Sequence, residues 1–173
     1  MSCISAPPVT GGCNGAAPHE SDGVPCHSVA KPSGTLLGIG LTCPSPELAQ
    51  ICGHAGFDVV LIDMEHGPIS VETAYRMVTA LAGTPAEAWI RVTWNDPALI
   101  KLALDTGARD IVVPMVTTRA EAEAAVAAAK YPPEGIRGWG PFRTQYQWRT
   151  NMLDYRPVHA ALIAARSTSV PRR

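Results

Sequence analysis

Short apolar runs alternate with amphipathic stretches from residue 35 to residue 130, and both repeat about every 25 residues. The runs are rich in aliphatic side chains and predict buried strands at 35–41, 59–62, 88–93 and 110–116. Helix-capping residues precede the amphipathic stretches and predict helices at 46–54, 71–81, 97–106 and 119–130. Strands that alternate with helices in this way predict a parallel sheet with the helices outside it.

The length of the chain limits the kind of sheet. A complete (β/α)8 barrel takes about 250 residues and rarely fewer than 200, whereas this chain has 173. Four βα units therefore predict an α/β fold that is either a small open sheet or the first half of a TIM (β/α)8 barrel. Residues 1–33 are rich in Pro, Gly and Ser and cannot bury enough apolar surface to fold, so they predict a disordered tail.

Composition and charge exclude several classes of function. The formal net charge is −1 at pH 7, so we expect no surface for nucleic acid or an anionic membrane. No apolar run approaches the ~18 residues of a membrane-spanning helix, and no secretory signal is visible. The cysteines lack the C-x-x-C spacing of a zinc knuckle, and we expect free thiols in a cytoplasmic protein. They are Cys3, Cys13, Cys26, Cys43 and Cys52.

Three ionisable side chains follow the predicted strand at 59–62. They are Asp63, Glu65 and His66, and Gly67 ends the group. The carboxyl ends of parallel strands are where α/β proteins place their chemistry. Histidine titrates near neutral pH, so His66 is a candidate general base, and a histidine that only caps a turn is the structural alternative. Asp63 could orient this imidazole or hold a metal-bound water.

Arg91 interrupts an otherwise apolar strand, and alternation places it on the face opposite its apolar neighbours. A charge on that face needs a partner, because an unpaired buried charge is costly. One partner is a substrate carboxylate or enolate, which the planar guanidinium fits. The alternative is a structural ion pair with Asp63, Glu65 or Asp105.

Asp105 and the long loop at 131–143 are two further candidates. Asp105 lies near the C-terminal end of a predicted helix, where the helix dipole disfavours an anion. We therefore expect a partner such as His66 or Arg91, and an exposed helix-end acid is the simpler alternative. The loop has no strand or helix period and carries several arginines and glycines, which favours anion binding or a subunit contact.

Five segments appear together in an order that resembles one known family. Together they resemble the HpcH/HpaI aldolase family, and within it the branch of 4-hydroxy-2-oxoheptanedioate (2-keto-3-deoxy sugar acid) aldolases. Each motif alone is weak, but five in order with similar spacing are specific. The resemblance runs from about residue 34 to residue 155. The segments are LIDMEHGP (61–68), IRVTWNDP (90–97), LDTGA (104–108), VPMV (113–116) and YPPEGIRG (131–138).

The resemblance implies a (β/α)8 barrel enzyme that assembles as a homo-hexamer. It implies a class II aldolase that uses a divalent metal (Mg²⁺, Mn²⁺ or Co²⁺) and cleaves a small 4-hydroxy-2-oxo acid to pyruvate and an aldehyde. His66 would be the catalytic base and Arg91 the cation that binds the pyruvyl oxygens and stabilises the enolate. Asp105 would be the acid that raises the basicity of the histidine.

The resemblance does not extend to the metal ligands. The family's ligands are a glutamate on the fifth strand and an aspartate on a later strand, and no matching segment occurs here. Residues 158–173 contain no Asp or Glu, so we assign no metal ligand. We therefore expect a tail (1–33), a partial barrel domain (34–157) that ends early, and a divergent C-terminal tail (158–173). The apolar run at 158–165 is helical at best.

Three functions remain open. The first is an aldolase-type carbon–carbon lyase whose activity is impaired because the metal-ligand half is missing. The second is a catalytically inactive fragment that acts as an oligomerisation or interaction module. The third is a different lyase or hydrolase in which Asp63, Glu65 and His66 themselves bind a metal.

Overall fold

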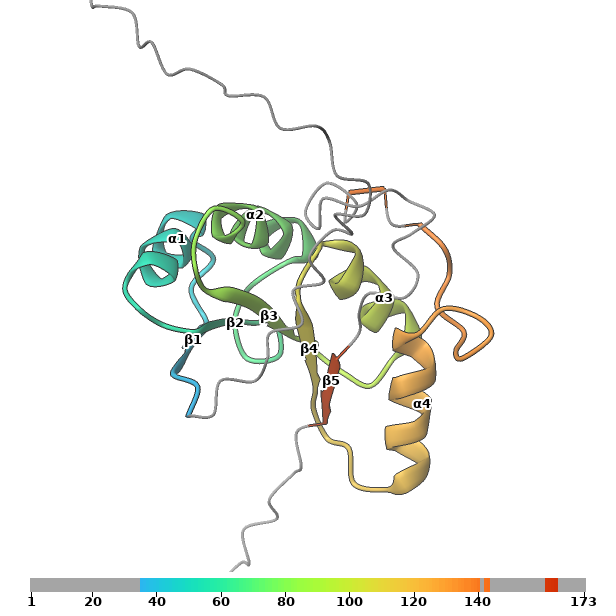
Figure 1. Ribbon diagram of the computed structural model, residues 1–173. Coiled ribbons are helices and arrows are strands. Elements are labelled where there is room, and N and C mark those ends of the chain that lie inside the picture. Colours follow the sequence, from blue (N-terminus) through green and yellow to red (C-terminus); the bar gives the residue numbers. More distant parts are fainter. Residues whose placement is uncertain (1–34, 141, 144–160, 165–173) are drawn as a thin grey trace, which may run out of the picture.

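The computed structural model describes residues 35–140, 142–143 and 161–164 (Figure 1). The tail predicted at 1–33 and most of the tail predicted at 158–173 lie outside these residues. No helix in the described ranges is long and apolar enough to cross a lipid bilayer. The elements alternate in the order β1 (Gly38–Leu41), α1 (Pro46–His54), β2 (Val59–Asp63), α2 (Val71–Leu81), β3 (Glu87–Arg91), α3 (Pro97–Asp105), β4 (Asp110–Val113), α4 (Arg119–Ala129) and β5 (Ala161–Ala164).

The strands form one parallel sheet whose order, β1-β2-β3-β4-β5, follows the chain. Right-handed crossovers between neighbouring parallel strands put the connecting helices on one side of a sheet. Figure 1 shows the four helices wrapped around one side of the strands. This arrangement is an α/β half-barrel, which confirms the fold class expected from the sequence.

The core lies between the sheet and its helices. Aliphatic side chains on the helix-facing positions of the central strands are completely buried: Val60, Ile62, Ile90, Ile111 and Val113. Because side chains alternate across a strand, the polar residues of the same strands lie on the opposite, inner face. These polar residues are Asp63, Glu87, Arg91 and Asp110. The alternation therefore separates the packing face of the sheet from the face that carries ionisable groups.

Local capping fixes the helices where the sequence predicts them. The helices at 46–54 and 71–81 have the predicted bounds. Each of the four begins after a side-chain cap, namely Ser45, Ser70, Asp96 or Thr118. The Thr118 cap is a complete capping box with Glu121.

Two predicted elements differ from the structure. The strand expected at 110–116 ends at Val113, because Pro114 has no N–H for the ladder and Met115 has a φ of 58°. The apolar run near the C-terminus was expected to be helical at best, and that expectation is wrong. Ala161–Ala164 is strand β5, paired in parallel with β4. An apolar run this short does not distinguish strand from helix by its periodicity.

Candidate active site

The candidate site lies at the carboxyl edge of the sheet, where β2 and β3 end side by side. Parallel pairing sets Asp63 opposite Arg91. The Arg91 guanidinium donates from Nε to Asp63 Oδ1 at 2.9 Å and from Nη2 to Asp63 Oδ2 at 2.5 Å. Glu65 Oε2 lies 3.2 Å from the same Nε. Of the partners considered for Arg91, the structure therefore supplies Asp63 and Glu65.

The turn after β2 is built around the same carboxylate. Asp63 Oδ1 also accepts the backbone N–H groups of Glu65 at 3.0 Å and of His66 at 3.2 Å. The Met64 N–H donates to the carbonyl of Arg91 at 3.0 Å, which joins the turn to β3. One buried aspartate thus fixes both the arginine and the backbone that carries His66.

The His66 side chain projects from this turn into solvent. Its exposed fraction is 68%, and its Nε2 lies 3.6 Å from Glu65 Oε2. The imidazole is therefore open to a ligand, with one carboxylate beside it. A histidine in this position can exchange a proton with a bound molecule.

Hydrogen bonding keeps the Asp63–Arg91 pair ionised. Burial opposes ionisation of the Asp63 carboxyl, but hydrogen bonds from Arg91 and the His66 N–H outweigh it, and the pKa of Asp63 is lowered. The hydrogen bond to Asp63 raises the pKa of Arg91 further above its ordinary value. Both groups therefore carry full charge at neutral pH.

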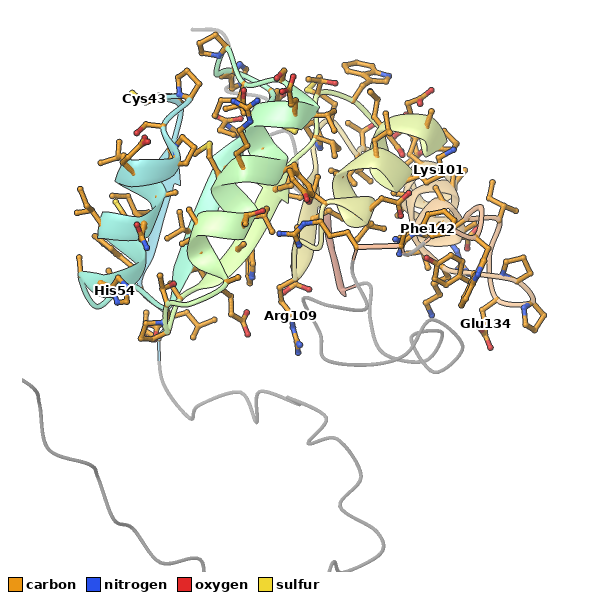
Figure 2. All side chains as sticks on the ribbon, turned by 90° about the horizontal axis from the view of Figure 1, so that it is seen from above. Cys43, His54, Lys101, Arg109, Glu134 and Phe142 are labelled. Carbon is orange, nitrogen blue, oxygen red and sulfur yellow. The ribbon has the colours of Figure 1, made fainter. Side chains whose placement is uncertain are left out.

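Asp105 lies at the other edge of the sheet. Helix α3 runs antiparallel to the strands, so its last residue reaches the amino edge. Figure 2 shows Cys43, which follows β1, at one edge, and His54 and Arg109 at the opposite edge. The expected contact of Asp105 with His66 or Arg91 is absent within one chain. Asp105 Oδ1 instead accepts from Arg137 Nη2 at 2.6 Å.

The Asp105–Arg137 pair is a buried anchor for the long loop. The Arg137 side chain is 0% exposed, and its guanidinium lies 4.6 Å from the centre of the Tyr131 ring. Burial raises the pKa of Asp105, although the hydrogen bond from Arg137 opposes the rise. The anion-binding role considered for the arginines of this loop is therefore wrong for Arg137, because its charge is enclosed.

A buried carboxyl at the amino edge escaped prediction from the sequence. Asp110 opens β4, is 7% exposed, and its Oδ1 has no hydrogen-bond partner in the part of the chain that the structure describes. Burial, aided by the nearby charge of Glu87, raises the pKa of Asp110 to about 6. The sequence feature that could have indicated this carboxyl is an aspartate at the first position of a strand that is buried on both faces.

The described residues do not fit a metal ion. No three of their His, Cys, Asp and Glu side chains are grouped so that they could hold one. The Asp63 oxygens are already engaged by Arg91 and by backbone N–H groups. The suggestion that Asp63, Glu65 and His66 form a metal site is therefore wrong. Cys43 and Cys52 are free thiols, as expected.

The family model described as HpcH/HpaI aldolase/citrate lyase matches residues 38–169. The chain belongs to this family. The match includes β5 and continues beyond residue 155, where the resemblance was expected to end.

Relatives with names and solved structures agree with this membership. The chain is 44% and 45% identical, over 104 residues, to the 4-hydroxy-2-oxo-heptane-1,7-dioate aldolases of Salmonella dublin and Salmonella arizonae. That alignment covers 60% of this chain and 40% of each relative. A HpcH/HpaI family protein from Burkholderia cenocepacia J2315 has a TM-score of 0.68 at 32% identity. The citrate synthase SbnG has a TM-score of 0.65 at 31% identity.

The coverage of these structures shows how much of a relative the chain represents. Each of the two alignments covers 75% of this chain, but only 53% and 50% of the respective neighbour. The chain therefore spans about half the length of its structural relatives, and less of the curated ones.

Proposed function

We propose that the chain carries the His66–Arg91 part of an aldolase-type carbon–carbon lyase site for a small 4-hydroxy-2-oxo acid. One observation carries the proposal: Asp63 holds a cation beside an accessible imidazole at the carboxyl edge of a parallel sheet. Family membership and the names of the Salmonella relatives support the reaction class.

These two side chains have the properties that retro-aldol cleavage needs. A base takes the proton of the 4-hydroxyl group, the bond between C3 and C4 breaks, and its electron pair forms the enolate of pyruvate. We assign the proton transfer to His66. We assign to Arg91 the binding of the carboxylate and 2-oxo oxygens, where negative charge grows as the bond breaks. Protonation of the enolate at C3 then yields pyruvate, and the other product is an aldehyde.

We route no step through a metal ion. A divalent ion acts in such a reaction as a Lewis acid on the 2-oxo group, but the described residues contain no grouped set of ligands for it. We therefore propose that turnover by this chain alone is low. Mg²⁺, Mn²⁺ and Co²⁺ are the ions to test.

Asp105 has no part in a site formed by one chain. It lies at the amino edge and is paired with Arg137, so a direct contact with His66 would require a second chain. The proposed role of Asp105 as the acid beside the histidine thus depends on the homo-oligomer that the family resemblance implies.

Ligand binding and turnover test this function separately. Oxalate mimics the planar enolate of pyruvate, and its binding to the full chain is measured by calorimetry. We expect Arg91→Met to weaken oxalate binding by about tenfold or more, because the charge-assisted hydrogen bonds are lost. We expect His66→Ala to retain binding but to abolish the residual release of pyruvate. Unchanged oxalate binding by Arg91→Met would contradict the proposal.

One observation favours the alternative of an interaction module. Three large apolar side chains of the loop that Arg137 anchors are exposed: Ile136 (67%), Trp139 (43%) and Phe142 (71%). Light scattering after size exclusion tests this alternative through the triple variant Ile136→Ser, Trp139→Ser, Phe142→Ser. A wild-type oligomer that releases no pyruvate and that the variant abolishes would support it, because the proposed lyase would also be an oligomer. A monomeric wild-type chain would contradict it.

A further inference from the structure

Asp63 makes more contacts than an ion pair requires. Its two oxygens accept two hydrogen bonds from Arg91 and one each from the N–H groups of Glu65 and His66. The residue is 4% exposed, so these contacts are shielded from water. Oδ1 accepts three of these hydrogen bonds, and Oδ2 accepts the one from Arg91 Nη2. Both oxygens of Asp63 are therefore bonded to groups of the protein itself.

The two contacts with Arg91 cover one particular edge of its guanidinium. This group has five N–H bonds in a plane: one on Nε and two on each of Nη1 and Nη2. Asp63 takes the Nε N–H and one N–H of Nη2. Among the described residues, no hydrogen bond or ion pair uses Nη1. The Arg91 side chain is 28% exposed, so solvent reaches part of it.

The uncovered edge has the geometry for a second carboxylate. Nη1 and Nη2 each present an outward N–H, and this pair matches the two oxygens of a carboxylate. Without Asp63, only Glu65 Oε2 of the described residues would remain beside Nε, Nη2 would lose its partner, and the long side chain would have more orientations. With Asp63 in place, one edge is committed to the protein and one remains for a ligand.

We propose that Asp63 is a positioning residue that presents the Nη1–Nη2 edge of Arg91 to the carboxylate of a 2-oxo acid and ties this edge to the turn that carries His66. This inference rests on the proposed function. It adds that the buried carboxylate of Asp63 fixes the position of Arg91, the binding group, relative to His66, the base. A fixed arrangement of this kind lowers the entropy that a ligand must lose on binding.

The charge of Asp63 and its positioning of Arg91 predict opposite effects of Asp63→Asn on oxalate binding. Removal of a negative charge beside Arg91 strengthens the attraction for any anion, whereas loss of the fixed edge weakens a bidentate ligand. We therefore expect Asp63→Asn to weaken oxalate binding by about tenfold and to leave the binding of chloride unchanged or stronger. Calorimetry and chloride competition on the full chain measure the two effects.

Glu65→Gln is the matched control. Glu65 also lies 3.2 Å from Arg91 Nε, and the change removes the same charge, but its side chain accepts no N–H of the turn among the described contacts. We expect Glu65→Gln to bind oxalate within about threefold of the wild type. Equal weakening by Glu65→Gln and Asp63→Asn would overturn the positioning role and leave only a charge effect. Wild-type affinity in Asp63→Asn would also overturn it.

A measurement on the wild-type chain decides the matter if Asp63→Asn does not fold. The Arg91 side-chain N–H signals are assigned in a nitrogen-15 spectrum by their loss in Arg91→Lys. On addition of oxalate, the Nη signals should shift and the Nε–H signal, held by Asp63, should stay in place. A large shift of the Nε–H signal would overturn the proposal.

The outcomes also separate this inference from the proposed function. If Arg91→Met binds oxalate like the wild type, the proposed function fails. If Arg91→Met loses binding but Asp63→Asn does not, the function stands and the positioning role fails.

Discussion

The two edges of the sheet use the same residue types in opposite ways. At the carboxyl edge, Asp63 pairs with a partly exposed Arg91, and the pKa of the aspartate is lowered. At the amino edge, Asp105 pairs with a fully enclosed Arg137, and the pKa of the aspartate is raised. At Asp63, hydrogen bonds lower the pKa by more than burial raises it. At Asp105, burial raises the pKa by more than the hydrogen bond from Arg137 lowers it. The charge of Arg91 at the carboxyl edge is partly accessible to solvent, whereas the charge of Arg137 at the amino edge is enclosed.

The comparison distinguishes Arg91, which we propose binds a ligand, from Arg137, whose side chain is enclosed. Both side chains contact a carboxylate within normal hydrogen-bond distance. What differs is exposure, which is 28% for Arg91 and 0% for Arg137. An ion pair alone therefore does not distinguish the two arginines, and the partial exposure of its side chain is what makes Arg91 the candidate for ligand binding.

The largest effect on stability should come from Arg137. Arg137→Met removes a buried cation and leaves Asp105 with only the charge of Lys101 nearby among the described residues, and we expect a loss of about 3 kcal/mol in the free energy of unfolding. Arg91→Met should cost less, about 1–2 kcal/mol, because two backbone N–H groups still donate to Asp63 Oδ1 and the Arg91 side chain is partly exposed. Urea denaturation measures both changes. A larger loss of stability in Arg91→Met than in Arg137→Met would show that Arg91 is the more important structural arginine.

A second test concerns the rigidity of the carboxyl edge. A Cβ on Gly67 would lie 2.6 Å from the Asp63 carbonyl oxygen and 2.8 Å from that of Thr42. We expect Gly67→Ala to destabilise the chain by about 2 kcal/mol, because the backbone must move. Gly40→Ala is the control, since nothing lies within 4 Å of its added Cβ. Equal unfolding midpoints for the two variants would show that the turn adapts.

A third test uses pH at the amino edge. The pKa of Asp110 is raised from 3.8 to about 6, so the folded chain binds this proton more tightly than the unfolded chain. The raised pKa of Asp110 therefore contributes to the free energy of unfolding. This contribution is fully present below pH 3.8 and is lost as the pH rises through about 6. Asp110→Asn should therefore stabilise the chain by about 2 kcal/mol at neutral pH. Urea denaturation at pH 4 and pH 8 checks this, and no gain at pH 8 would contradict it.

The smallest effect should come from Glu121, at the carboxyl edge. Hydrogen bonds from the backbone N–H groups of Thr117 and Thr118 lower its pKa from 4.5 to about 2. This contribution to stability is present above pH 4.5 and is lost as the pH falls through about 2, the opposite sign to Asp110. Glu121→Gln should make the urea midpoint less sensitive to acid, and Glu123→Gln should not. If the urea midpoints of the wild type and of Glu121→Gln fall equally as the pH is lowered, this contribution of Glu121 is excluded.

Local signals were sufficient to predict most of the fold. Ser45 and Ser70 act on N–H groups within three residues, so the sequence around them predicts the starts of α1 and α2. Strand β5 depends instead on pairing with β4, about fifty residues away, and its short apolar run contains no sign of that pairing.

The candidate site was predictable in its residues but less so in its contacts. The position of Arg91 in an apolar strand predicted an inner-face charge with a nearby acid, and strand register then selected Asp63. The partner of Asp105 was not predictable, because Arg137 lies 32 residues away on a loop without periodicity. Periodicity also conceals a polar residue such as Asp110 at the start of a buried strand.

The close approach at Gly67 has a consequence for protein engineering. Because the main chain of Thr42 fills the space where a side chain of residue 67 would lie, the turn after β2 and the segment after β1 are complementary surfaces. A graft of residues 63–67 into another barrel would fit only if the recipient's β1 segment follows the same path. The two segments therefore form one transplantable module, and a library that varies them should vary them together.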